Sequence, residues 1–172
     1  MLLLEGVIAE AGTRRVLDGL DLAVPRGDCF GVVGSDLDAL RTLVELLAGR
    51  RTPAAGRVRI DGLDPIDNAE VLVGRVVVDV VTSAAQPLDA GGADVWLVVD
   101  GRADAGPTDR AALAARLDTL HRGLHRTVLF ATADRELAAA VCGRLAFLVG
   151  GRLLAPPLDR APVADVHARS QP

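Results

Sequence analysis

The chain has 172 residues, half of them hydrophobic, and a formal net charge of −4. This length allows one well-buried domain and is too short for two ordinary ones. The acidic balance provides no basic footprint for nucleic acid, so we expect no nucleic-acid partner. No apolar run approaches the ~18 residues that a membrane-spanning helix needs, so we also expect no direct membrane insertion.

Runs of Val, Leu and Ile recur along the chain and predict β-strands. The opening MLLLEGVI has no charged leader segment and indicates a first strand, not a secretion signal. Blocks such as VVVDVV and TVLF are almost wholly apolar, which is typical of parallel strands that are covered on both faces. The predicted strands are 2–8, 20–24, 28–33, 56–60, 76–81, 95–99, 127–131 and 145–149.

Helical patterns lie between these strands. We place the cap of the first helix at Asp38 and its end at Gly49, because a short acidic side chain favours a helix start and glycine favours a helix end. Leucines at helical spacing predict a second helix, and the segment 136–141 predicts a third. The leucines are Leu40, Leu43 and Leu47 in the first helix and Leu113, Leu117, Leu120 and Leu124 in the second.

The alternation of strands and helices predicts an α/β fold with a mainly parallel sheet and helices on its faces. The first strands and the RVRIDG segment suit an antiparallel N-terminal flank, and FLVGGRLLAPP predicts a closing hairpin around Gly150 and Gly151. We expect one core domain over 1–154 and a proline-rich, flexible tail over 155–172.

Two residue pairs suggest redox or metal chemistry but are better explained by packing. Cys29 and Cys142 lie in apolar segments, which is typical of buried, reduced thiols. His121 and His125 are four residues apart, a spacing found in metal sites, but no third ligand accompanies them. We therefore expect no metal site and a solvated helix face at the two histidines.

The order of these segments resembles a known family. The stretch LDGLDLAVPRGDCFGVVGSDLDALRTLVELLAGRRTPAAGRVRIDGLDP resembles the N-terminal half of the ATP-binding subunits of ABC transporters. The later stretches ADVWLVVDG and TVLFATADRELAAAVCGRLAFLVGGRLLA are similar to the Walker B strand, the switch strand and the closing hairpin of that family. The resemblance covers residues 1–88 and 93–155 and implies a P-loop NTPase-like three-layer core.

The family's phosphate-binding loop is altered in this sequence. The motif G-x-x-x-x-G-K-[ST] uses glycines to expose backbone amides and a lysine to reach the terminal phosphates. Here the second glycine, the lysine and the hydroxyl residue are replaced by Ala39, Leu40 and Arg41, and the chain contains no lysine at all. The vestigial nucleotide site implied by the resemblance is Gly34, Ser35, Asp36, Ala39, Leu40, Arg41, Thr42 and Asp100, of which Asp100 matches the Walker B carboxylate.

Other positions of the family pattern are also changed. Gly101 replaces the glutamate that acts on the attacking water, Ala133 replaces the switch histidine, and no aromatic lies near Ala11 to stack on adenine. Asp79 occupies the place where the glutamine loop begins, and Gln86 is a candidate relic of that loop. Residues 104–110 suit either a remnant of the family's D-loop or a turn that caps a helix.

The family also has a helical subdomain with an LSGGQ signature, for which only TSAAQPLDAGGAD remains between two strands. We interpret its Gly91–Gly92 pair as a turn. In ABC ATPases each site combines one subunit's P-loop with its partner's signature, and this chain supplies neither. Loss of the lysine and of the stacking aromatic would weaken a micromolar site about a thousandfold or more.

We therefore expect a pseudo-ATPase with no catalytic residues, no cofactor and no metal. The expected role is a scaffold or regulatory subunit at the cytoplasmic face of a membrane, bound to an integral-membrane transporter subunit, another membrane protein or another ABC ATPase subunit. One alternative is an ATP-binding, weakly hydrolysing transporter subunit in which Arg41, Thr42 and Asp100 hold ATP and Mg²⁺. The other is a free-standing cytosolic adaptor, because the missing subdomain normally docks the membrane subunit.

Overall fold

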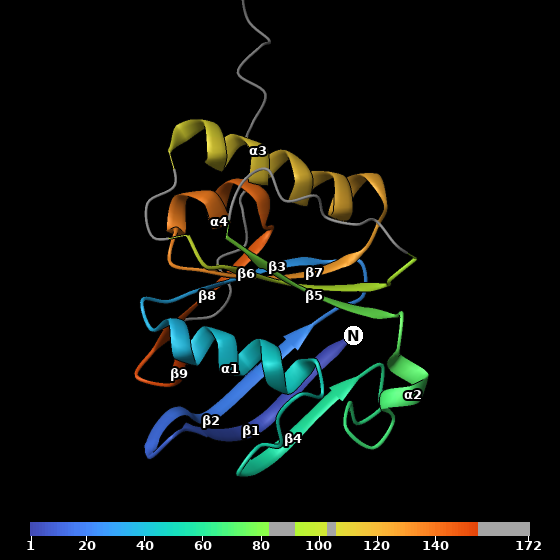
Figure 1. The fold of residues 1–172 in the computed structure, drawn as a ribbon, viewed down its shortest axis with the longest axis vertical. Coiled ribbons are helices and arrows are strands. Elements are labelled where there is room, and N and C mark those ends of the chain that lie inside the picture. Colours follow the sequence, from blue (N-terminus) through green and yellow to red (C-terminus); the bar gives the residue numbers. More distant parts are fainter. Residues whose placement is uncertain (83–91, 103–105, 155–172) are drawn as a thin grey trace, which may run out of the picture.

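The computed structural model describes residues 1–82, 92–102 and 106–154. An antiparallel sheet with strand order β2-β1-β4 lies below a six-stranded sheet with order β5-β6-β7-β3-β8-β9 (Figure 1). The smaller sheet consists of β1 (Leu2–Ala11), β2 (Arg14–Val24) and β4 (Ala55–Ile60). The larger one consists of β3 (Cys29–Val33), β5 (Val76–Val81), β6 (Val95–Asp100), β7 (Thr127–Thr132), β8 (Arg144–Val149) and β9 (Arg152–Leu154).

Five strands of the larger sheet are parallel, and only β9 pairs antiparallel, as the closing hairpin with β8. The predicted α/β class, with a mainly parallel sheet and an antiparallel N-terminal flank, is confirmed. Strands β6 and β7 are buried over their whole length, which explains their continuous apolar sequences. No helix among the described residues is long and apolar enough to span a membrane.

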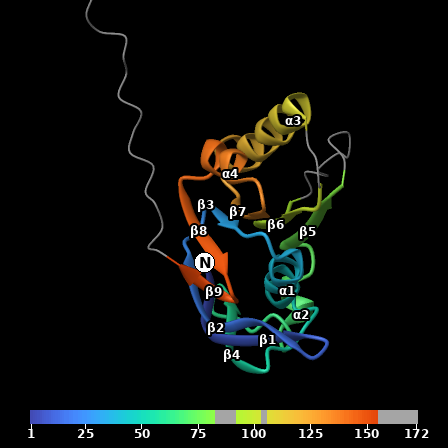
Figure 2. The same cartoon turned by 90° about the vertical axis from the view of Figure 1, so that its left-hand side faces the viewer.

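Helices cover both faces of the larger sheet. Helices α3 (Pro107–Asp118) and α4 (Arg135–Val141) lie on one face, and α1 (Leu37–Leu47) lies between the two sheets (Figures 1 and 2). One apolar cluster therefore joins α1 to both sheets, and a second lies under α3 and α4. The remaining helical pieces are α2 (Ala69–Leu72), which the sequence did not predict, and the π-helical turn η1 (Thr119–Gly123).

Hairpin β8–β9 ties the larger sheet to β2 of the smaller one. The backbone N–H of Asp18 donates to the Gly151 carbonyl at 2.8 Å, and Arg152 pairs with the Asp18 carboxylate at 2.7 Å. Gly151 has φ +80°, and a Cβ there would lie 2.9 Å from the Val16 carbonyl oxygen, so this close approach requires glycine.

Several local predictions need correction. The cap of α1 is Asp36, and Asp38 lies within the first helical turn, because the Asp36 carboxylate reaches the amides of that turn. Leu124 lies beyond η1 and is exposed, so the second helix is shorter than its leucine spacing predicts. The expected strand 20–24 is the end of the longer β2. The predicted tail 155–172, Gln86, Gly91 and Asp104 lie outside the described residues.

Candidate nucleotide site

The segment that resembles a phosphate-binding loop lies at the carboxyl edge of the parallel sheet. Strand β7 lies between β3 and β6, so Val33, Thr132 and Asp100 end side by side. Immediately after β3, the backbone N–H of Gly34 donates to the Thr132 carbonyl at 3.0 Å. The fold thus brings the loop before α1 and the Walker B-like carboxylate to one edge, where ligands bind in open α/β sheets.

A carboxylate of the protein already occupies the start of α1. Oδ1 of Asp36 accepts hydrogen bonds from the backbone N–H groups of Asp38 at 3.1 Å and Ala39 at 3.2 Å. The unpaired amides and the dipole of a helix N-terminus favour an anion, which is why phosphates bind there in P-loop proteins. In this chain the Asp36 side chain takes that role, while the preceding Ser35 is exposed.

Arg14 holds this carboxylate from the β1–β2 hairpin. Its Nη1 lies 2.5 Å from Oδ2 of Asp36, and its Nη2 contacts Oδ1 of Asp36 at 3.2 Å and the Asp38 carboxylate at 3.3 Å. The hydrogen bond from Arg14 lowers the pKa of Asp36, with a further contribution from the Ala39 amide, against the opposing effect of burial. No local sequence pattern indicated Arg14, because the contact spans 22 residues and depends on the position of the hairpin.

The position of the missing lysine faces the core. Leu40 is 1% exposed, and its Cδ2 would lie 3.6 Å from a Cβ built on Gly34. Ala39 and Thr42 are also buried, whereas Arg41 is exposed. One residue along a helix turns the side chain by about 100°, so Arg41 does not occupy the direction of Leu40. The Thr42 side chain is buried, at 2% exposure.

The Asp100 carboxylate forms an ion pair with Arg102, a residue that no sequence motif indicated. The Arg102 guanidinium forms a bidentate pair with it, with Nε–Oδ1 at 2.7 Å and Nη2–Oδ2 at 2.9 Å. Both side chains are buried, at 5% and 4% exposure, and the Thr132 hydroxyl donates to Oδ2 at 3.3 Å. The hydrogen bond to Asp100 raises the pKa of Arg102. The pair lies only two residues apart, but spacing alone did not show that Arg102 folds back onto Asp100.

Three further positions of the family pattern are Gly101, Ala133 and Asp79. A Cβ at Gly101 would meet Val81 and Val80 at ordinary contact distances, so the backbone itself leaves room for a side chain there. Ala133 is exposed after β7. Asp79 lies on β5, where burial raises the pKa of its carboxyl and the charge of Arg116 opposes that rise.

The two histidines do not form a helical pair. His121 lies in η1, whereas His125 follows it with φ +53° and lines a pocket at the other edge of the sheet. Within the described ranges no group of three or more His, Cys, Asp or Glu side chains is placed to hold a metal. Pro107 begins α3 after the cap Gly106, so the described part of the candidate D-loop forms a helix start.

The two cysteines are both buried and free, with their sulfur atoms 3.2 Å apart. The hydrogen bond with Cys29 and burial raise the pKa of the Cys142 thiol.

These residues do not fit a bound Mg-nucleotide as they are arranged. Asp36 uses the first amides of α1, Leu40 faces the core, and the Asp100 carboxylate is held by Arg102 and Thr132. A triphosphate would meet the carboxylates of Asp36 and Asp38 before it reached the helix. As arranged, these groups stabilise the loop before α1.

Sequence comparisons connect this arrangement to known proteins. The mycobactin import ATP-binding/permease protein IrtB of Mycolicibacterium thermoresistibile is 33% identical over 109 residues, which is 63% of this chain and 19% of IrtB. The methionine import ATP-binding protein MetN of Cutibacterium acnes is 44% identical over 54 residues, 31% of this chain and 15% of MetN. The matches thus span under a fifth of these curated relatives. No protein-family model matches the chain.

Structural comparison finds proteins with the same fold. The structure of cbiO1 from Clostridium perfringens, part of the ABC transporter complex cbiONQ, aligns with a TM-score of 0.73 at 14% identity. The alignment covers 90% of this chain and 86% of cbiO1. The chain is thus similar in sequence and in fold to ABC-transporter ATP-binding domains. Residues 82–94 alone join β5 to β6, which leaves no length for the helical subdomain and signature of those domains.

Proposed function

We propose that this ABC-ATPase-like chain is a non-catalytic subunit that acts as scaffold or regulator in a membrane transport or other membrane-protein complex. The observation that best supports this proposal is the occupied anion position at α1, where Asp36 accepts from two backbone amides and pairs with Arg14. An anion of the protein itself then replaces the phosphate, and the loop keeps its shape without a ligand.

The Walker B-like position supports the same proposal. The Asp100 carboxylate already accepts three hydrogen bonds from Arg102, two from its guanidinium and one from its backbone N–H, and one from Thr132. It therefore has little capacity left for a magnesium ion. Gly101 provides no general base, and the chain has no lysine to stabilise charge on a transferred phosphoryl group. We therefore propose that the protein is not an ATPase.

The preserved core is the reason to propose a binding role. Both apolar clusters remain closely packed around α1 and under α3 and α4, although the catalytic residues of the family are replaced. The proposed partner is an integral-membrane transporter subunit, another membrane protein or another ABC ATPase subunit, and the proposed place of action is the cytoplasmic face of the membrane. The name of IrtB pairs an ATP-binding part with a permease, which fits such a partner.

An ATP-binding transporter subunit is the second candidate, favoured by the names of IrtB and MetN. In this case Arg41, Thr42 and Asp100 would hold ATP and Mg²⁺ after the Arg14 and Asp36 side chains had moved away from the start of α1. A free-standing adaptor is the third candidate, because the chain lacks the subdomain that docks the membrane subunit in this family.

Calorimetric titration of the purified chain with Mg-ATP tests the first proposal against the second. We expect that Mg-ATP does not bind with a dissociation constant below about 1 mM. Arg41→Ala removes the exposed cation next to the site, and Arg50→Ala removes an exposed cation beyond the other end of α1 as the matched control. Sub-millimolar binding that Arg41→Ala abolishes and Arg50→Ala preserves would overturn the non-catalytic proposal.

Purification from native membranes tests the partner. We expect a tagged chain to retain an integral-membrane protein after mild detergent extraction, and to release it when surface contacts are disrupted by high salt or stronger detergent. Recovery of the chain alone, from the soluble fraction, would favour the free-standing adaptor.

A further inference from the structure

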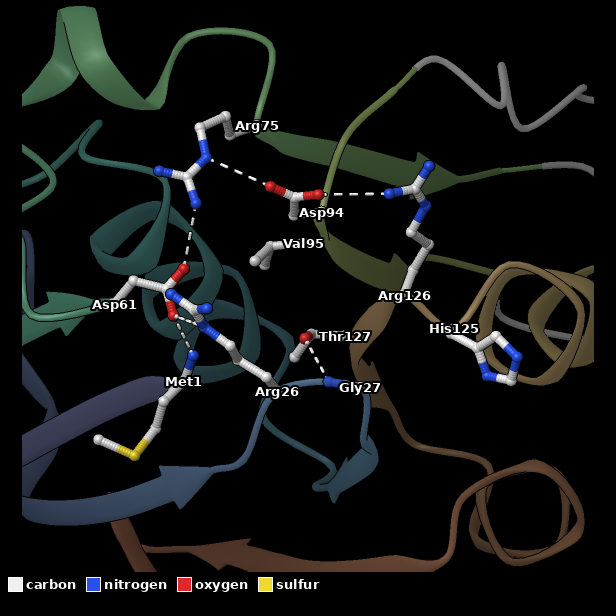
Figure 3. Close-up of a pocket in the computed structure, with 10 residues that line it drawn as sticks. All are labelled: Met1, Arg26, Gly27, Asp61, Arg75, Asp94, Val95, His125, Arg126 and Thr127. Atoms are coloured by element: carbon white, nitrogen blue, oxygen red, sulfur yellow. Dashed lines mark hydrogen bonds and ion pairs between the residues drawn. The ribbon is translucent and has the colours of Figure 1, made fainter.

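A second charged pocket lies at the amino edge of the six-stranded sheet, opposite the segment that resembles a P-loop. It forms where β3, β6 and β7 begin and has a volume of about 210 Å³. Figure 3 shows charged side chains from separate segments arranged around Val95. The lining residues with polar side chains are Arg26, Asp61, Arg75, Asp94, His125, Arg126 and Thr127.

Arginines outnumber carboxylates in this pocket. Arg75 lies between the two acids, with Nη2 at 3.2 Å from Asp61 and Nε at 3.3 Å from Asp94. Arg26 pairs with Asp61 at 2.6 Å, and Arg126 pairs with Asp94 at 3.3 Å (Figure 3). Three guanidinium groups and the N-terminal ammonium of Met1 thus share two carboxylates, so the pocket has a positive surplus in a chain whose net charge is −4.

Most of the hydrogen-bond donors of these arginines have no protein partner among the described residues. Each guanidinium has five N–H groups, and within the described part of the chain the three make four hydrogen bonds, all to carboxylates. The Nε of Arg126 is buried and has no hydrogen-bond partner among the described residues. A buried donor without a partner is costly, so an acceptor at this place would be favourable.

The three arginines have different roles in the pocket. Arg75 binds both acids and joins the turn after β4 to the start of β6. Arg26 and Arg126 each use one N–H group on one acid, and they approach from opposite sides of Val95 in Figure 3. Their remaining N–H groups are available to a shared anion, and the exposed His125 lies beside Arg126 on the pocket wall.

We propose that this pocket binds a small phosphate-bearing molecule of about diphosphate size. The planar fork of arginine matches the oxygens of a phosphoryl group, and two forks on opposite walls suit an anion with several oxygens. The backbone N–H of Gly27 does not contribute, because it donates to the Thr127 hydroxyl at 2.9 Å. This site is separate from the α1 loop and does not depend on the function proposed above.

Calorimetric titration with inorganic pyrophosphate, without magnesium, tests the proposal. We expect a dissociation constant below about 1 mM, at least tenfold weaker in the double variant Arg26→Gln/Arg126→Gln. Arg50→Gln, which removes an exposed arginine beyond the end of α1, is the matched control and should leave the affinity unchanged, whereas Arg41→Gln reports any binding at the α1 loop. A parallel titration with ADP distinguishes a free diphosphate from a nucleotide as the source of the phosphate.

Each outcome has a defined meaning. Absence of pyrophosphate binding, or binding that the double variant preserves, overturns the proposal. Binding that Arg41→Gln alone abolishes also overturns it and additionally argues against an occupied anion position at α1. Circular dichroism verifies the fold of the double variant, and if that variant fails to fold, Arg26→Gln alone decides, because the Arg26 side chain is 71% exposed.

Discussion

The two edges of the six-stranded sheet both contain arginine–aspartate clusters, but their charge balance differs. At the carboxyl edge, Arg14 and Arg102 face the three carboxylates of Asp36, Asp38 and Asp100. At the amino edge, three arginines face the two carboxylates of Asp61 and Asp94. Among the ion-paired groups, carboxylates outnumber arginines at the first edge and arginines outnumber carboxylates at the second, so a phosphate should be attracted more strongly to the second edge. Both edges contain ion pairs, so the ratio of arginines to carboxylates is the property that distinguishes them as places for an anion.

The largest expected effect comes from removing the buried cation of the carboxyl edge. Arg102→Ala leaves the Asp100 carboxylate buried without its bidentate partner, which costs about 3–5 kcal/mol of unfolding free energy. Urea denaturation measures the loss. The double variant Arg102→Ala/Asp100→Asn removes both charges and should recover part of the stability. Equal losses of unfolding free energy in the single and double variants would show that the ion pair does not stabilise this edge of the sheet.

Restoring the missing lysine is the next test. Leu40→Lys places an ammonium group in the apolar core, and we expect it to cost at least as much as a buried leucine truncation, about 2–5 kcal/mol. Leu40→Met preserves volume and should cost less than about 1.5 kcal/mol. Denaturation of both variants and titration with Mg-ATP check the result. A stable Leu40→Lys variant that binds ATP would show that this position can reach a ligand.

The Asp36 carboxylate has a smaller, separable role. Asp36→Ala removes both the helix cap and the Arg14 pair and should lower the unfolding free energy by about 1 kcal/mol. Asp36→Ser preserves a cap acceptor and removes only the pair, so its stability should stay close to that of the unaltered chain. Thermal unfolding compares the two variants. Equal destabilisation would mean that the Arg14 contact, not the cap, is what matters.

The pH dependence of stability follows from the same group. The Arg14 hydrogen bond lowers the folded-state pKa of Asp36, so the stabilisation is complete above the unfolded-state value of about 3.9 and is lost as the pH falls through the lower folded-state value. Urea unfolding between neutral pH and about pH 3 should therefore show a smaller acid-induced loss in Asp36→Ser than in the unaltered chain. An identical loss in both would indicate that Asp36 does not contribute.

The smallest effect is expected at the amino edge. Arg26→Gln removes an exposed side chain from a cluster in which Arg75 still joins both acids, so thermal unfolding without ligand should not change measurably. The same variant should weaken pyrophosphate binding. A large loss of stability would instead identify the amino-edge cluster as a structural network like that of Arg102 and Asp100.

The sequence predicted the fold better than the site. Buried parallel strands such as β6 and β7 have an apolar pattern that local reading can detect, and the glycines near Gly150 identify the closing hairpin. The replaced motif positions were also visible in the sequence. The contacts that now occupy these positions were not visible in the sequence, because the Arg14–Asp36 contact joins segments 22 residues apart. The amino-edge pocket likewise depends on contacts between Arg26, Asp61 and Asp94 that only the folded chain creates.

The junction at Gly151 has a consequence for how the molecule unfolds. Because β9 belongs to the larger sheet yet bonds to Asp18 of the smaller one, neither sheet can separate without breaking the hairpin contacts. The two sheets should therefore exchange their backbone amide hydrogens as one cooperative unit, and a bulky residue at Gly151 should divide that unit into two. A single glycine at the β8–β9 turn thus joins the two sheets into one cooperative unit.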